Sequence, residues 1–304
     1  MKKLFIIMQK NWNDIKSKED KKLLVEFAER GKLSMRIYAA AIFGVVGVYF
    51  LSAVVPKFLD IVKPLNESRN HVFLYETEYF VDQDKYYYQI LLHGYLTVPI
   101  SVGVIIFFDN MLACYVSHIC GCLAVVSANL KRLHIDTEPY TEKNNFEKNQ
   151  RLHKRIIYCA KIHNNTLEFV KLVESSVSTA LIFVIGFSTV IITVTGIVSV
   201  MKLNDPNEAA RFMAFAFGGI SHLYYISSQG NLLIQESEAV HKASYFCEWY
   251  TLPPTYRKLI IIIMMRSKKP AKITAGKFYT LCNESFGDGL KKAMSLFTLL
   301  KSSL

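Results

Sequence analysis

The sequence lacks the short motifs that mark most enzyme sites. It has no glycine-rich phosphate loop, no HExxH metal motif and no Cys-x-x-Cys pair. Its eight histidines are scattered along the chain, and Glu236 and Glu238 lie at a helix end, where charges are usually solvated or at an interface. An enzyme needs a convergent acid, base or nucleophile. We therefore expect no enzymatic activity, no metal site and no other cofactor.

The sequence has few cysteines, and no secretory signal peptide is evident in it. The six cysteines are dispersed, and Cys120 and Cys122 are too close together for the usual zinc spacing. We therefore expect them to be small buried thiols rather than a disulfide framework. After the first basic residues, the apolar run from Leu4 to Met8 is shorter than the apolar region of a signal peptide. The first membrane span is expected to act as its own insertion signal.

What the sequence does contain is a series of long apolar runs. Ile37–Val55, Val177–Met201 and Phe212–Ile234 carry no formal charge, and Tyr95–Leu130 is a similar run interrupted by Asp109 and His118. Each run reaches the length of about 20 residues that a helix needs to cross a bilayer. Four such runs in one chain exclude a soluble core and predict a polytopic membrane protein.

A fifth segment, Ile273–Leu300, has membrane length but is too polar to be surrounded by lipid. It contains five charged residues: Lys277, Glu284, Asp288, Lys291 and Lys292. Charges at bilayer depth are costly, and they usually face a protein interior or water. This pattern predicts a last helix that lines an aqueous path.

The distribution of positive charge gives the orientation of these five spans. The net charge of +11 is confined mainly to one side: residues 1–36, 129–176 and 235–277 hold 27 lysines and arginines, and the segments on the other side hold seven. Basic residues stay in the cytoplasm, so this pattern does not indicate nucleic-acid binding. We predict an all-α polytopic membrane protein with five transmembrane helices, a cytoplasmic N-terminus and an extracellular C-terminus.

Three further features allow more than one interpretation. Asp109 is either a ligand or ion contact, or a partner in a hydrogen bond between helices. Asn66 begins an Asn-Glu-Ser glycosylation sequon in the predicted outer loop 57–94. Such sequons are common by chance, but its place on the predicted extracellular side agrees with the charge pattern. The aromatic outer half of Phe212–Ile234 is compatible with helix packing or with the wall of an apolar pocket.

The last third of the chain resembles the insect odorant receptors, a seven-helix family, and is closest in style to the hymenopteran sets. The matching residues are Gln229-Gly230, Glu236-Ser237, Tyr245, Trp249-Tyr250, Arg257-Lys258, Met264-Met265-Arg266-Ser267, Lys269-Pro270, Thr274-Ala275-Gly276-Lys277-Phe278, Glu284-Ser285-Phe286, Leu290-Lys291 and Ser295-x-Phe297. Upstream, Trp12 and the three tyrosines before His93 also look like the family. The resemblance implies that the chain corresponds to the third to seventh helices of the family fold and lacks the first two.

This resemblance also implies a function and a set of sites. Such receptors assemble with a co-receptor into tetrameric, odorant-gated, non-selective cation channels in the plasma membrane of olfactory sensory neurons. The implied ligand is a volatile small organic molecule. The implied regions are a cytosolic amphipathic segment 1–36, a ligand-sensing bundle 37–234 with cytosolic extensions 118–176, an anchor region 235–272, and a pore-lining helix with outer tail 273–304. The implied sites are pocket residues Tyr49, Phe50, Ile100, Phe187, Phe212 and Phe215, pore and gate residues Phe286, Asp288, Leu290 and Lys291, and anchor residues Tyr245, Trp249, Tyr250, Lys269 and Pro270.

Two other functions remain open at this point. One is a truncated, non-sensing partner that joins the co-receptor without binding odorant. The other is a small-solute transporter, a class that often shows an internal repeat and broken helices in both halves. The sequence shows no such repeat and only one broken segment, Leu259–Met265 before the turn at Pro270.

Overall fold

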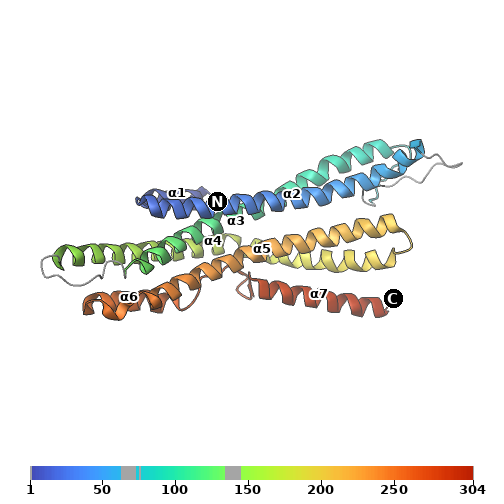
Figure 1. Ribbon diagram of the computed structural model, residues 1–304. Coiled ribbons are helices and arrows are strands. Elements are labelled where there is room, and N and C mark those ends of the chain that lie inside the picture. Colours follow the sequence, from blue (N-terminus) through green and yellow to red (C-terminus); the bar gives the residue numbers. More distant parts are fainter. Residues whose placement is uncertain (1, 63–72, 75–76, 134–144, 304) are drawn as a thin grey trace. The chain divides into compact units, whose positions relative to one another are not determined.

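The computed structural model of the chain describes residues 2–62, 73–74, 77–133 and 145–303, and Asn66 lies outside them. Within these ranges the fold is almost entirely helical (Figure 1). Its elements, in order, are α1 (Lys2–Asp14), α2 (Lys18–Val62), α3 (Tyr87–Lys131), α4 (Asn145–Met201), α5 (Pro206–Phe246), the 3-10 helix η3 (Trp249–Thr251), α6 (Pro254–Ser267), β1 (Thr274–Ala275), β2 (Tyr279–Thr280) and α7 (Asn283–Ser303).

The apolar runs of the sequence lie in long continuous helices. The second span and its predicted cytosolic extension form the single helix α3, and the third span continues from its basic leading segment in α4. In the described part of the chain, three stretches are long and apolar enough to cross a membrane: Lys18–Leu51, Tyr87–Lys131 and Asn149–Met201. The total of five spans and the direction of the termini stay predictions, with the other two predicted spans lying in α5 and α7.

The predicted last span differs from the structure at its start. It was expected to be helical from Ile273, but residues 274–275 and 279–280 pair as an antiparallel hairpin, and α7 begins only at Asn283. Gly276 and Lys277 have φ angles of 60° and 67°. This left-handed backbone turns the chain and is incompatible with a right-handed helix. The observed last helix is therefore shorter than predicted.

The chain divides into two compact units, which are described separately. Unit one comprises residues Met1–Ser34, Leu112–Val184 and Ile226–Phe286, and unit two comprises Met35–Met111, Ile185–Tyr225 and Gly287–Leu304. Helices α2, α3, α4, α5 and α7 each contribute residues to both units.

Unit one is built around the second half of α3. Nearly every side chain in residues 112–130 is buried, and Tyr115 and Leu123 are 0% exposed. A helix that is apolar on all sides has to be surrounded by other elements. Helix α2 approaches it closely at Gly121, where a Cβ atom would lie 3.1 Å from Cδ2 of Leu24.

A buried carboxylate joins three helices of unit one. Asp20, in the first turn of α2, is 2% exposed. It accepts hydrogen bonds from Nδ2 of Asn129 on α3, at 2.9 Å, and from the hydroxyl of Tyr158 on α4, at 3.1 Å. The hydroxyl of Ser17 accepts the Asp20 N–H at 3.5 Å and caps the helix. These partners offset the cost of burying the charge and fix where α2 starts against α3 and α4.

Unit two exposes many large apolar side chains. Ile100 and Phe107 on α3 are 68% and 67% exposed, and Phe187 on α4 is 65% exposed. Soluble monomers rarely expose apolar surface so extensively. The outward face of this unit is suited to contact with lipid.

Candidate functional site

A polar network lies inside unit two, at the level of the apolar runs. The side chain of Asp109 on α3 is completely buried, accepts a hydrogen bond from the Tyr38 hydroxyl on α2, and lies 3.0 Å from Nε2 of His222 on α5. The other ring nitrogen of His222 lies 3.2 Å from the hydroxyl of Ser188 on α4. One carboxylate and one imidazole therefore connect four helices. The hydrogen bond between helices that one interpretation of Asp109 predicts is present at Oδ2, while Oδ1 is buried without a hydrogen-bond partner among the described residues.

Aromatic stacking extends this network along α5. The rings of Tyr38 and Tyr225 are nearly parallel, with centroids 3.9 Å apart, and the Tyr225 hydroxyl donates to Oδ1 of Asn110 at 3.4 Å. The neighbouring residues of α3, Asp109 and Asn110, thus each bind a tyrosine hydroxyl. Polar side chains that bond across helices are a typical source of specificity in membrane bundles.

A second cluster joins three of the six predicted pocket residues. Tyr49, only 6% exposed, packs edge-on against Phe215 with ring centroids 4.5 Å apart, and it contacts Phe50 at 6.3 Å. Phe50 in turn packs edge-on against Tyr95, at 4.6 Å, and its carbonyl oxygen accepts the Tyr95 hydroxyl. Such edge-to-face pairs form a mostly apolar wall with a few fixed polar groups, as in small-molecule sites.

The other three predicted pocket residues are outside this cluster. Phe212 is half-buried on α5, whereas Ile100 and Phe187 direct most of their surface outward. A ligand-binding role for all six residues stays a prediction.

Sequence reasoning missed Arg211, which joins the aromatic cluster to a distant part of the chain. Its guanidinium carbon lies 5.3 Å from the centre of the Tyr49 ring, and Nη2 donates to the carbonyl oxygens of Phe73 and Leu74 at 3.0 and 2.9 Å. Nη1 pairs with Glu208 at 2.5 Å. Arg211 immediately precedes the aromatic outer half of the predicted span Phe212–Ile234. Because a cation over an aromatic ring is stabilising, this neighbourhood is the sequence signal that could have indicated its role.

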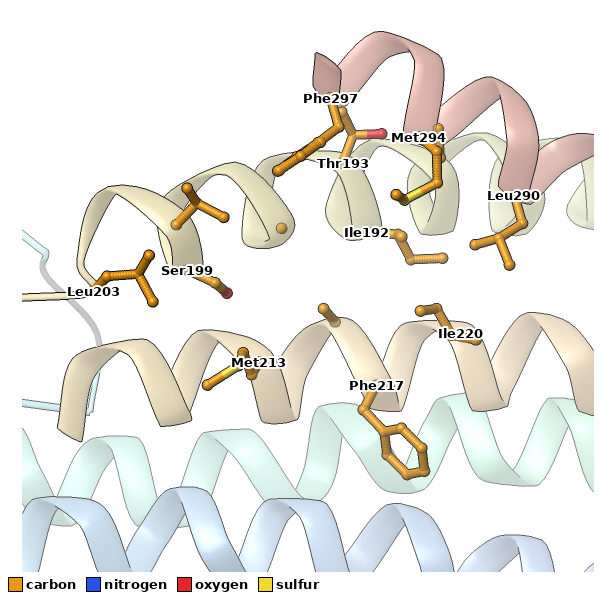
Figure 2. A pocket seen from close by; sticks show the side chains of 14 residues that line it. Ile192, Thr193, Ser199, Leu203, Met213, Phe217, Ile220, Leu290, Met294 and Phe297 are labelled. Atoms are coloured by element: carbon orange, nitrogen blue, oxygen red, sulfur yellow. The ribbon is translucent and has the colours of Figure 1, made fainter. Parts of the chain in front are cut away.

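A groove of about 390 Å³ lies in unit two between α4, α5 and α7 (Figure 2). Its volume falls in the range of small-molecule sites. The lining residues are Ile192, Thr193, Gly196, Ser199, Val200, Leu203, Met213, Ala216, Phe217, Ile220, Leu290, Ala293, Met294 and Phe297. Thr193 and Ser199 donate their hydroxyl groups to the carbonyl oxygens of their own helix, at 2.9 and 2.6 Å. The groove is therefore apolar in character.

The four predicted pore and gate residues lie on different faces of α7. Leu290 is half-buried in the groove, opposite Ile220 of α5 (Figure 2). Asp288 and Lys291 are exposed and 3.6 Å apart. Phe286, one turn before Leu290, is half-buried. Helix α7 thus has one apolar face toward α4 and α5 and one charged face.

The predicted anchor region in unit one exposes several aromatic side chains. Tyr245 and Tyr250 are 58% and 60% exposed, and Trp249 packs edge-on against Tyr250 with centroids 6.2 Å apart. Between them, burial raises the pKa of the Cys247 thiol, so this side chain stays protonated at neutral pH. Lys269 is exposed and Pro270 half-buried, just before the hairpin.

The family model described as 7tm Odorant receptor matches residues 2–294 of this chain. The chain belongs to the odorant receptor family. Odorant receptor 13a of Drosophila melanogaster is 26% identical over 207 residues, which are 64% of this chain and 48% of the relative. The odorant receptor coreceptor of the same species is 26% identical over 152 residues, which are 48% of this chain and 30% of the relative. The chain spans about half the length, or less, of the curated relatives it matches.

Solved structures show that the odorant receptor fold is present. The insect olfactory receptor OR5 from Machilis hrabei in complex with eugenol matches with a TM-score of 0.65, covering 95% of this chain and 70% of that one. A second structure of OR5 from Machilis hrabei matches with a TM-score of 0.59. Sequence identity is 12% and 13%, so the likeness is one of fold. Membership in this family of membrane receptors also confirms that the chain is not an enzyme.

Proposed function

We propose that this chain is an odorant receptor subunit in which binding of a volatile organic molecule opens a cation channel formed with the co-receptor. The observation that carries the proposal is the family match over residues 2–294, together with a last helix that has one apolar and one charged face. A plasma-membrane location in olfactory sensory neurons follows from the same proposal.

The aromatic cluster of unit two is the proposed ligand site. A solved relative in fold is a complex with eugenol, a small aromatic molecule. The packed rings of Tyr49, Phe50 and Phe215 would offer apolar aromatic surface to a small aromatic ligand. The Tyr95 hydroxyl and Arg211 lie next to these rings. A ligand shifts a channel toward its open state only if it binds that state more tightly. The closely packed cluster is suited to such a difference because it must rearrange to admit a ligand.

Helix α7 is the proposed pore lining. Asp288, Lys291 and Lys292 are exposed, while Leu290 and Ala293 face α4 and α5. A charged face of this kind is costly against lipid and favourable against water. Around a central axis, four copies of such a helix would present rings of charge to passing ions. Phe286 and Leu290 are the proposed gate, a role that requires Leu290 to turn out of the groove toward the pore in the assembled channel.

Assembly with the co-receptor is proposed to use the aromatic surface around Tyr245 and Tyr250. The chain is similar in sequence to co-receptors of Drosophila melanogaster and Harpegnathos saltator, at 26% and 25% identity. Exposed aromatic residues are enriched at protein interfaces. Lys269 and Pro270 are proposed to belong to the same surface.

The test is current recording from cells that express this chain together with the co-receptor, during exposure to a panel of volatile odorants. We expect a current in response to at least one odorant that is absent when either protein is expressed alone. Conversion of Tyr49 to alanine should shift the response to higher odorant concentration. Co-purification of the two proteins without any such current would contradict the sensing role and support the non-sensing assembly partner.

A further inference from the structure

The segment between α6 and α7 is a small hairpin held inside unit one (Figure 1). Thr274 pairs with Thr280 and Ala275 with Tyr279, and the N–H of Leu281 donates to the carbonyl oxygen of Ile273 at 3.0 Å. Helix α7 begins two residues later, at Asn283. A two-stranded hairpin of this size is marginally stable by itself. Its position has to be fixed by the helices around it.

Helix α4 holds the first strand of the hairpin by two directional contacts. The Glu174 carboxylate accepts hydrogen bonds from both the N–H of Thr274, at 3.1 Å, and the hydroxyl of Thr274. Four residues further along α4, the Ser178 hydroxyl accepts the N–H of Gly276 at 2.9 Å. Residues four apart lie on the same face of a helix. This face of α4 therefore binds successive groups of the hairpin backbone.

Helix α5 holds the two ends of the same segment. The Ser237 hydroxyl accepts the N–H of Ala271, ahead of the first strand, at 2.9 Å. After the second strand, Leu281 lies so near to Gly230 that a Cβ atom there would be 2.2 Å from the Leu281 carbonyl oxygen. Because that atom belongs to the backbone, it cannot move aside without moving the start of α7.

The tip of the hairpin is equally restricted. Gly276 has a φ of 60°, and a Cβ atom there would lie 2.6 Å from the Phe278 ring and 2.7 Å from Ile182 of α4. Glycine is the residue that adopts this conformation without steric cost. The hairpin thus contacts α4 at Thr274 and at its tip.

We propose that Glu174, Ser178, Gly230 and Ser237 are positioning residues that, through this hairpin, set the place of the first turn of α7, which belongs to unit one. Residues 271–282 are called the latch. The attachments come from two different helices, so a shift of α4 relative to α5 has to move the latch and the first turn of α7 with it. The inference rests on the proposed function, in which α7 lines the pore, and it assigns the coupling of helix movement to pore opening to these four residues.

Hydrogen exchange tests whether these residues position the latch. The complex with the co-receptor is measured in lipid nanodiscs, comparing the unmodified chain with Glu174→Ala and Ser178→Ala. We expect exchange in residues 271–282 to become at least about tenfold faster, because the amides of Thr274 and Gly276 lose their acceptors. Glu168→Ala is the matched control, since Glu168 is an exposed glutamate of the same helix that binds Asn164. Unchanged exchange in both latch variants would overturn the proposal.

Current recording tests whether positioning matters for gating. Odorant-evoked current per receptor at the cell surface should fall at least threefold in Glu174→Ala and less in Glu174→Gln, which keeps an acceptor oxygen. Gly230→Ala should also lower it, and Ser237→Ala is the milder variant if Gly230→Ala does not reach the surface. Faster exchange with unchanged current would overturn the coupling role.

The two proposals fail in different ways. If the unmodified chain passes no odorant-evoked current with the co-receptor, the proposed channel function is wrong. The exchange comparison then decides by itself whether Glu174 and Ser178 position the latch.

Discussion

The two units of this chain distribute polar and apolar side chains in opposite ways. In unit one, residues 112–130 of α3 are almost entirely buried, and ion pairs such as Arg30–Glu26, at 2.6 Å, lie on the outside. In unit two, Phe107 and Phe187 are largely exposed, while Asp109 is completely buried and bound by Tyr38. Unit one is organised like a protein in water, and unit two like a protein in lipid.

The difference shows which interactions specify each unit. In water, removal of apolar surface is the main favourable term in folding. In a bilayer the lipid chains are as apolar as the side chains, so hydrogen bonds and close packing between helices have to specify the structure. We therefore expect equivalent truncations of apolar residues to differ greatly in cost between the units.

The largest expected effect is the loss of a buried ring in unit one. Phe169 on α4 is 1% exposed and packs edge-on against Tyr115 and His118, with centroids 6.1 and 5.8 Å away. Phe169→Ala should lower the free energy of unfolding by about 3–5 kcal/mol through lost burial and the cavity that remains. Thermal unfolding of the purified chain in lipid bicelles, followed by circular dichroism, measures this change.

The same substitution in unit two is the matched control. Phe187 lies on the same helix and is 65% exposed. Phe187→Ala should change the free energy of unfolding by less than about 0.5 kcal/mol, as surface substitutions usually do. Equal losses in the two variants would contradict the comparison between the units.

An intermediate effect is expected from the polar network of unit two. Asp109→Ala leaves the Tyr38 hydroxyl without its acceptor and His222 without its carboxylate. A buried group that loses its partner costs about 1–3 kcal/mol, so unfolding in bicelles should become easier by that amount. Asp109→Asn keeps an acceptor oxygen and should cost less. A variant Asp109→Ala as stable as the unmodified chain would show that apolar packing alone specifies unit two.

Apolar run length was sufficient to predict the long helices and the membrane class, because these depend on local composition, and the family was predicted from a resemblance in the residues of the last third of the chain. The contacts inside the units were beyond such reasoning. Asp109 binds Tyr38 from 71 residues away, and Glu174 binds Thr274 from 100 residues away. The sequence predicts helix at the latch because a single glycine, Gly276, does not indicate a left-handed turn. The contacts of Arg211 could not be predicted either, because its acceptors at Phe73 and Leu74 are distant in sequence.

The smallest effect on stability is expected from substitutions on the charged face of α7. The same substitutions should have the largest effect on ion conduction. The side chains of Asp288 and Lys291 are 60% and 82% exposed and 3.6 Å apart. An exposed pair of this kind contributes about 0.5 kcal/mol or less, so Asp288→Asn should unfold like the unmodified chain, as should Glu26→Gln at the exposed pair of unit one. If α7 lines the pore, Asp288→Asn should nevertheless lower single-channel cation conductance, and Lys291→Gln should raise it, because rings of charge attract or repel passing ions. Conductance that is unchanged in both variants would mean that this polar face contacts another subunit rather than water.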